Sequence, residues 1–315
     1  MFKKAFIIRL SLLILLVAGF VLLFIFLKPQ ASDTTASPEQ TAKLRVATSF
    51  YPLYFLAQEI GGEQAVVINV TPAGAEPHDY EPTPRDIATI TDSRLLILNG
   101  LGLEPWENSI KSNINSAQTK IIVMGDELSS AELKNNNIDS VDPHIWLSPI
   151  LITQMLDKIT DGFVAVDFEN KNYYQARALE LRKKLLDLNQ DYLSGLSNCQ
   201  KQDIVTAHAA FAYLADAYNF QQISIAGLSP EVEPSPSQMI NIVKLVRDRQ
   251  IKYIFFESLV SPKLADTIAA ETGAETLVLN PIEGLTPEEL SAGKNYFTEM
   301  KNNLINLQIA LECQT

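Results

Sequence analysis

The stretch FENKNYYQARALELRKKLLDLNQDYLSGLSN, residues 168–198, has the apolar spacing of one long helix. At 1.5 Å per residue a helix of about 30 residues would span about 45 Å, which is more than a single small domain requires. Because strand-and-helix patterns lie on both sides of it, the stretch predicts a rigid helix that connects two lobes. A coiled-coil arm is the alternative interpretation.

Short apolar runs alternate with helical segments on both sides of this stretch. Local signals mark the helix ends, such as Thr83 before Pro84 at a start and Gly61 followed by Gly62 at a stop. Continuous apolar runs between helices are typical of a buried, mostly parallel sheet. The expected strands are 44–49, 65–72, 94–100, 119–125, 203–207, 221–227, 251–258 and 274–281, and a closing helix is expected over 291–313.

This alternation predicts an α/β fold with two lobes, each containing a mostly parallel sheet flanked by helices. We expect an N-terminal lobe over 44–167, the connecting helix over 168–198 and a C-terminal lobe over 199–315. The total of 315 residues is long enough for two domains.

Residues 1–28 have the pattern of a signal peptide or a transmembrane anchor. Basic residues precede an apolar run of 18 residues, 10–27, which is closer in length to a spanning helix than to a cleaved signal. We favour an uncleaved anchor, with cleavage near Ala36 as the alternative. Residues 29–43 are rich in Pro, Ser and Thr and predict a flexible tether. The basic end should stay in the cytoplasm, which places the rest of the chain outside.

Composition and cysteine content limit the classes of partner. The net charge of −12 makes nucleic acid an unfavourable partner. The only cysteines are Cys199 and Cys313, which can pair in an oxidising compartment. A disulfide would join the C-terminus to the start of the second lobe; two unpaired thiols are the alternative.

The chain has only three histidines, and each has a distinctive setting. His78 comes after the expected strand 65–72, and His208 directly follows the expected strand 203–207. Carboxyl ends of strands are where open α/β sheets place their ligands. His144 lies between two prolines just before an expected helix. One loop histidine is usually a surface or capping residue, but three neutral imidazoles together suit Zn²⁺ in a cleft between the lobes.

Six motifs occur in order along the chain: AEPHDYEPTP (75–84), DPHIWLSP (142–149), VTAHAAFAYLA (205–215), GLSPEVEPSP (227–236), FFESLVSPK (255–263) and LNPIEGL (279–285). Together they resemble the solute-binding proteins of zinc and manganese ABC transporters. The resemblance covers residues 44–315. It implies two α/β lobes bridged by a long helix, with one metal ion bound between them.

The resemblance also implies a ligand set. His78, His144 and His208 match the three imidazole ligands of the family, and Glu283 matches the carboxylate that several zinc-binding members supply after the last strand. Many relatives have Asp where this chain has Asn280, and Asn is a poor anionic ligand. Members tuned to manganese tend to replace one imidazole by a carboxylate. The resemblance therefore favours Zn²⁺, with Mn²⁺ as the alternative.

Acidic residues near the ligands are candidates for balancing charge or accepting imidazole N–H groups. Solvated or capping acids are the alternative interpretation for each of them, and one, Glu76, is also a candidate direct ligand. The tryptophan of DPHIWLSP is expected to serve packing. The candidate acids are Glu76, Asp79, Asp142 and Glu257.

Two features differ from many zinc-binding members of the family. The segment 127–142 is short and has no histidine, so a metal-collecting loop is not expected. No cysteine follows the N-terminal apolar run, so a lipid-modified cysteine is not expected either.

The function implied by the resemblance is capture of a divalent metal ion outside the cytoplasm and delivery to an ABC permease. The chain would then be membrane-anchored, periplasmic or secreted, and it would not be an enzyme. A zinc hydrolase is an alternative, but a fourth protein ligand would close the position that a catalytic water needs. An adhesin-like surface role is a third alternative.

Overall fold

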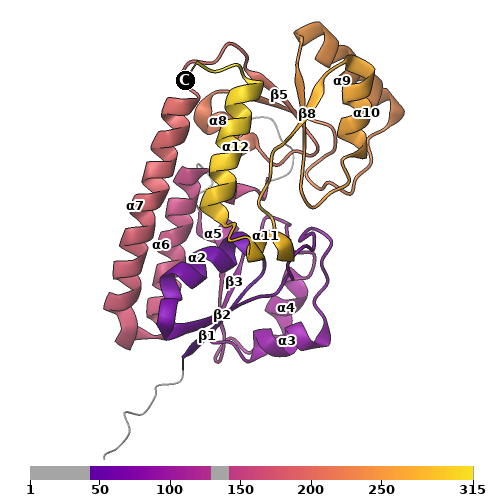
Figure 1. Cartoon of the computed structure of the whole chain (residues 1–315). Coiled ribbons are helices and arrows are strands. Elements are labelled where there is room, and N and C mark those ends of the chain that lie inside the picture. Colours follow the sequence, from indigo (N-terminus) through magenta and orange to yellow (C-terminus); the bar gives the residue numbers. More distant parts are fainter. Residues whose placement is uncertain (1–42, 129–141, 315) are drawn as a thin grey trace, which may run out of the picture. The chain divides into compact units, whose positions relative to one another are not determined.

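The computed structural model describes residues 43–128 and 142–314, and the chain from Lys43 onward forms one compact unit (Figure 1). The predicted anchor, 1–28, and all of the predicted tether except Lys43 lie outside the described residues. Among the helices of the described part, none is long and apolar enough to cross a membrane.

Two four-stranded parallel sheets form the framework, which confirms the predicted fold class. The strand order is β2-β1-β3-β4 in the first sheet and β6-β5-β7-β8 in the second, so both sheets have the same topology. All eight expected strands are present, each shortened by one to four residues. Their bounds are β1 (Leu44–Thr48), β2 (Ala65–Asn69), β3 (Leu95–Leu98), β4 (Lys120–Val123), β5 (Asp203–Thr206), β6 (Gln221–Ser224), β7 (Tyr253–Phe256) and β8 (Glu275–Val278).

Helices cover both faces of each sheet (Figure 1). Several begin as the sequence predicts, because Thr83, Ser148 and Ser235 each accept a hydrogen bond at a helix start that has Pro in its first turn. The helices are α2 (Tyr51–Gly61), α3 (Pro84–Thr91), α4 (Glu107–Asn113), α5 (Met124–Glu127), α6 (Pro149–Val166), α7 (Lys171–Gly195), α8 (Ala212–Tyr218), α9 (Pro236–Arg249), α10 (Lys263–Thr272), α11 (Pro287–Ser291) and α12 (Tyr296–Ala310).

The two sheets share one hydrophobic core. Alternate residues of each strand point to opposite faces, so Val46 of β1 packs with α2 and α6, while Ala47 packs with α3 and α4. In the second sheet, Ile204 and Phe255 face the same core as Val46, whereas Val205 faces a separate core with α9 and α10. The shared core therefore runs from one sheet to the other without interruption.

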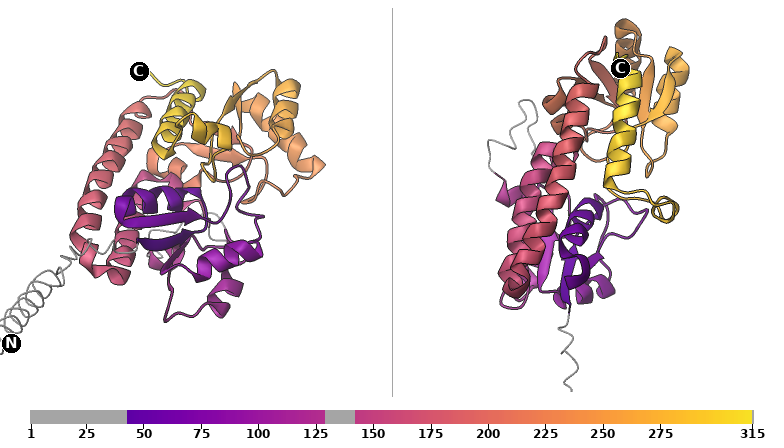
Figure 2. Two further views of the ribbon diagram at one scale, coloured as in Figure 1. Left: turned by 60° about the horizontal axis from the view of Figure 1, so that its bottom comes forward. Right: turned by 60° about the vertical axis from the view of Figure 1, so that its left-hand side comes forward.

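The long helix is present but shorter than predicted. A 3₁₀ turn occupies Phe168–Asn170, and α7 itself has 25 residues, which corresponds to about 37 Å. It packs against α6, α2 and α12 along its length (Figure 2). Leu179, Leu186 and Leu193 follow the helical spacing but lie on the exposed side of α7.

The C-terminal region differs from the prediction of one helix over 291–313. It contains α11 and α12, separated where Gly293 adopts a φ of +79°. Asn295 then starts α12 by accepting hydrogen bonds from the backbone N–H groups of Phe297 and Thr298. The single-helix prediction was wrong because it ignored this stop and the new cap.

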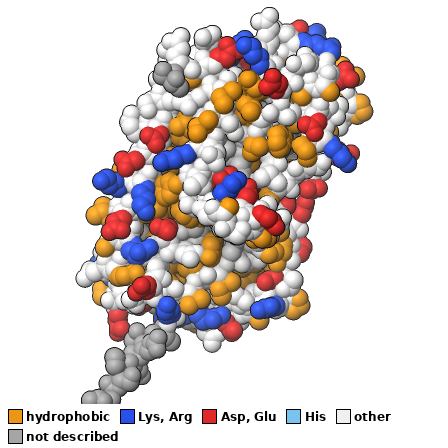
Figure 3. All heavy atoms as spheres, in the orientation of Figure 1, with side chains coloured by type: hydrophobic (Ala, Val, Ile, Leu, Met, Phe, Trp, Pro, Cys, Tyr) orange, Lys and Arg blue, Asp and Glu red, His pale blue; other side chains and the backbone are white. Residues whose placement is uncertain are grey.

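The predicted disulfide between Cys199 and Cys313 is present and ties the end of the chain to the start of β5. On the face shown in Figure 3, acidic and basic side chains are interspersed among apolar ones. The negative net charge is therefore not concentrated into one patch on that face.

Candidate metal centre

Four segments that are far apart in the sequence meet between the two sheets. His78 lies in the segment between β2 and α3, and His144 lies just before the 3₁₀ turn Ile145–Leu147 that leads into α6. His208 follows β5 by two residues, and Glu283 lies between β8 and α11. The structure thus brings together all four residues that the sequence analysis named.

The four side chains present their ligand atoms to one small volume. The Nε2 atoms of His78 and His208 lie 3.4 and 3.2 Å from Nε2 of His144. Oε1 of Glu283 lies 3.4, 3.2 and 3.3 Å from the three Nε2 atoms of His78, His144 and His208. One ligand atom from each of the four residues lies within 4.8 Å of all the others.

These separations match a tetrahedral shell around zinc. With metal–ligand bonds of 2.0–2.1 Å, the corners of a tetrahedron are about 3.3–3.4 Å apart. Five of the six separations lie between 3.2 and 3.4 Å, and the sixth, between His78 and His208, is within 4.8 Å. The spacing therefore fits one small cation with nitrogen and oxygen ligands.

The Glu283 carboxylate is buried, and the three imidazole Nε2 atoms lie 3.2–3.4 Å from its Oε1. Its side chain is 1% exposed, and neither oxygen accepts a well-formed hydrogen bond from any residue in the described part of the chain. A buried carboxylate without well-formed hydrogen bonds is costly, and a bound cation removes that cost. The donor set therefore fits a divalent metal ion.

Buried carboxylates orient two of the three imidazoles. Nδ1 of His144 donates to Asp142 at 2.6 Å, and Nδ1 of His208 donates to Glu257 at 2.6 Å. The same carboxylates also accept from the backbone N–H groups of His144 and His208 at 2.9 and 3.2 Å. With Nδ1 protonated and held, Nε2 of each ring is left free and faces the cluster.

His78 is held differently. Its backbone N–H donates to Glu76 at 3.3 Å, but no residue within 43–128 or 142–314 accepts a hydrogen bond from Nδ1. Its side chain is 8% exposed, whereas those of His144 and His208 are 0% exposed.

The four candidate acids have different outcomes. The structure places Asp142 and Glu257 against imidazoles, as predicted. Glu76 contacts the backbone of His78 and is not among the clustered ligand residues, while Asp79 is exposed and contacts no imidazole.

Burial and neighbouring charges shift the pKa values of the site residues in opposite directions. Burial alone would lower the pKa of His208, but the charges of Glu257 and Glu283 raise it well above its usual value. Burial would raise the pKa of Glu283, but His208 and the other imidazoles hold it well below its usual value. Burial and the charge of Glu283 raise the pKa of Glu76 to about 9. Protons therefore compete with a metal ion for His208.

The side chain of Trp146 makes a polar contact in addition to the packing expected from the sequence. It is fully buried, and its Nε1 donates to the backbone oxygen of Pro281 at 2.7 Å. Nothing local in the sequence signals a bond between segments 135 residues apart.

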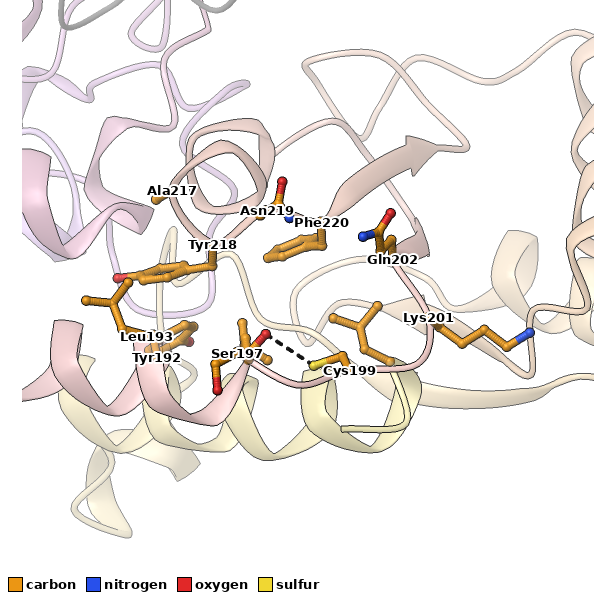
Figure 4. Close-up of a pocket in the computed structure, with 12 residues that line it drawn as sticks. Tyr192, Leu193, Ser197, Cys199, Lys201, Gln202, Ala217, Tyr218, Asn219 and Phe220 are labelled. Carbon is orange, nitrogen blue, oxygen red and sulfur yellow. Dashed lines mark hydrogen bonds between the residues drawn. The ribbon is translucent and has the colours of Figure 1, made fainter. Parts of the chain in front are cut away.

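Two hollows in the described structure differ in their relation to the site. One, of about 340 Å³, is lined by Tyr51 and Tyr54 of α2 and by Glu283 itself, so it reaches one of the four clustered residues. Another, of about 250 Å³, lies between the end of α7 and α8 beside Cys199 (Figure 4). None of the four clustered residues lines the second hollow.

The chain is similar to known proteins over most of its length. The family described as "Zinc-uptake complex component A periplasmic" matches residues 46–310. The high-affinity zinc uptake system protein ZnuA of Bacillus subtilis (strain 168) is 36% identical over 292 residues, which cover 89% of this chain and 92% of that protein.

Two comparisons involve the AdcA protein of Streptococcus pneumoniae. A zinc-binding lipoprotein of that name is 35% identical over 273 residues, covering 83% of this chain and 54% of the relative, so the chain spans about half of that protein. The crystal structure of the Zn(II)-bound ZnuA-like domain of AdcA superimposes with a TM-score of 0.75 at 34% identity. That match covers 86% of this chain and 100% of the solved domain.

Proposed function

Because the chain belongs to the family of periplasmic zinc-uptake components, we propose that it captures Zn²⁺ outside the cytoplasm and delivers it to the permease of an ABC transporter. The observation that carries the proposal is that five of the six ligand-atom separations among His78, His144, His208 and Glu283 are 3.2–3.4 Å. They fit the edges of a zinc tetrahedron.

The choice of zinc over manganese rests on the ligand types. Three imidazoles and one carboxylate form a compact nitrogen-rich set, whereas Mn²⁺ prefers more oxygen ligands. Three neutral imidazoles and one carboxylate would leave a net charge of +1 with Zn²⁺. The buried Asp142 and Glu257 supply negative charge beside the rings and offset it.

A hydrolase is the weaker candidate because we assign Glu283 to the fourth position. A catalytic zinc site keeps one position for water, and the four ligand atoms here lie within 4.8 Å of one another, close enough for all four to bind one ion. We therefore infer a binding role without chemistry.

We also propose the organisation expected from the sequence, with lobes at 44–167 and 199–315, a joining segment at 168–198 that contains α7 (Lys171–Gly195), and a membrane anchor in 1–28. Mass analysis of the protein recovered from membranes would test the anchor, since a cleaved signal peptide would shorten the chain.

The function is tested by competing Zn²⁺ and Mn²⁺ for the purified full-length protein at equal free metal concentrations. We expect zinc to win and to raise the melting temperature through preferential binding to the folded state. Substitution of each ligand histidine by alanine should weaken zinc binding. Preference for manganese would refute the zinc assignment, and unchanged zinc affinity after every single substitution would refute the site.

A further inference from the structure

The segment that carries Glu283 contains an unusual backbone conformation. Ile282 has a φ of +57° and is fully buried. Left-handed backbone is sterically unfavourable for residues other than glycine, and a β-branched residue there is a clear outlier. Such a conformation persists only where the surrounding structure holds it. Because Ile282 directly precedes Glu283, its conformation sets the direction in which the carboxylate points.

The amide of Asn280 holds this conformation from within the segment. Its Oδ1 accepts from the backbone N–H of Ile282 at 2.7 Å. Asn303 of α12 fixes Asn280 in turn, since its side chain accepts from the backbone N–H of Asn280 at 2.8 Å and donates to its backbone oxygen at 2.7 Å. Asn280 and Asn303 are both buried, so water does not compete for these bonds. Asn280 therefore acts on Glu283 through the backbone.

Trp146, from the segment before α6, holds the same segment by a second contact. Its Nε1 donates to the backbone oxygen of Pro281 at 2.7 Å, and its own backbone oxygen accepts from the hydroxyl of Tyr296 at 2.8 Å. Trp146 comes two residues after His144, and their rings lie 5.2 Å apart. The indole therefore joins the segment of one ligand to the segment of another.

The Glu283 side chain has polar contacts at 3.2–3.4 Å with the three imidazole Nε2 atoms, but no well-formed hydrogen bond from a described residue fixes either of its oxygens. We propose that Asn280 and Trp146 are positioning residues that hold the strained backbone at Ile282 and so keep the Glu283 carboxylate directed at the three imidazoles. This inference rests on the proposed zinc site. When the carboxylate is held in place, zinc has to break its bond to Glu283 in order to leave. The two positioning residues should therefore act mainly by slowing zinc dissociation.

The test measures zinc dissociation from the full-length protein after mixing the zinc-loaded form with excess chelator. Trp146→Phe keeps the aromatic ring and removes the N–H donor, and Asn280→Ala removes the acceptor for Ile282. We expect each to speed zinc dissociation by about 10-fold, the lower range for residues that support metal ligands. Asn280→Ala also keeps the proposal testable if Trp146→Phe prevents folding of the metal-free protein.

Matched controls separate positioning from general stability. Trp106→Phe alters the other tryptophan, which packs on the far face of the first sheet. Asn306→Ala removes another bond from α12, the 2.8 Å bond from its side chain to the backbone oxygen of Val278. Neither control should speed dissociation by more than about 2-fold.

A double-mutant cycle with Glu283→Gln decides whether the two residues act through Glu283. In that background, Trp146→Phe and Asn280→Ala should change dissociation by less than about 2-fold, because the carboxylate that they position is gone. Equal effects in both backgrounds, or no effect in the wild-type background, would overturn the proposal. If Glu283→Gln by itself leaves zinc binding unchanged, the ligand assignment fails instead, which is a separate result.

Discussion

The two sheets have the same strand order, yet they support their histidines differently. In the second sheet, His208 follows β5, and Glu257 follows the neighbouring strand β7, so the acid and the imidazole meet at 2.6 Å. In the first sheet, His78 lies nine residues beyond Asn69 at the end of the edge strand β2. No described residue accepts from its Nδ1. A shared topology thus places ligands at the same edge but does not orient them.

The third imidazole, His144, is oriented by a carboxylate from its own segment. His144 does not follow a strand, and its carboxylate comes from Asp142, only two residues earlier. That segment is tied to its surroundings, since the side chain of Asn99 donates to the backbone oxygen of Pro143 at 2.9 Å. A buried carboxylate therefore orients His144 and His208 through Nδ1, while no described residue accepts from Nδ1 of His78.

The largest expected effect comes from removing one of the oriented ligands. His208→Ala should lower zinc affinity by more than about 100-fold, because it removes a ligand and leaves Glu257 buried without its partner. His78→Ala should cost less, since no buried acid is left unpaired. Competition titration against a zinc chelator measures both. An equal or larger loss for His78→Ala would contradict the comparison between the two sheets.

The next effect concerns the acids that orient the rings. Glu257→Gln and Asp142→Asn should each weaken zinc binding by about 10- to 100-fold, as is typical when a ligand histidine loses its carboxylate. The same titration applies. Asp79→Asn is the matched control, because Asp79 is exposed and contacts no imidazole. A loss for the control equal to that for the two buried acids would show that overall charge, not orientation, sets the affinity.

The pH dependence of zinc binding should reflect the buried carboxylate beside His208. Zinc requires the neutral imidazole, and the pKa of His208 lies well above its usual value, so protons compete with zinc at neutral pH. Zinc affinity should therefore rise with pH, by up to about tenfold per unit for each proton displaced. Glu257→Gln removes a charge that raises this pKa, so it should flatten the dependence between about pH 7 and 8. Titrations at several pH values test this, and a steeper dependence in the variant would contradict it.

Much of the fold follows from local patterns. Buried parallel strands appear as short apolar runs, and the caps at Thr83, Ser148 and Ser235 mark helix starts because each side chain bonds a backbone N–H group three residues on. The three histidines could also be predicted as one site from the sequence, because each lies near the end of an expected strand or the start of an expected helix. The resemblance then added Glu283 as a candidate ligand.

The support of the site could not be predicted in the same way. The left-handed backbone of Ile282 contradicts the preference of a β-branched residue, and only the contacts from Asn280 and Trp146 make it acceptable. Those contacts depend on how α12 and the segment before α6 pack together. Local sequence carries no signal for such long-range bonds.

The smallest expected effect on zinc affinity comes from removing the disulfide in the second half of the described chain. The disulfide joins Cys199 to Cys313 after the end of α12, whereas the Glu283 segment precedes the start of that helix. The double substitution of both cysteines by serine should lower the free energy of unfolding by about 2–5 kcal/mol, because the long loop between them is no longer closed. Zinc affinity should change by less than about 2-fold, since the bonds from Asn303 to Asn280 do not involve the disulfide. Denaturant unfolding and zinc titration of the same variant separate the two effects. A large loss of affinity would mean that the disulfide, and not the hydrogen bonds of α12, holds the carboxylate in place.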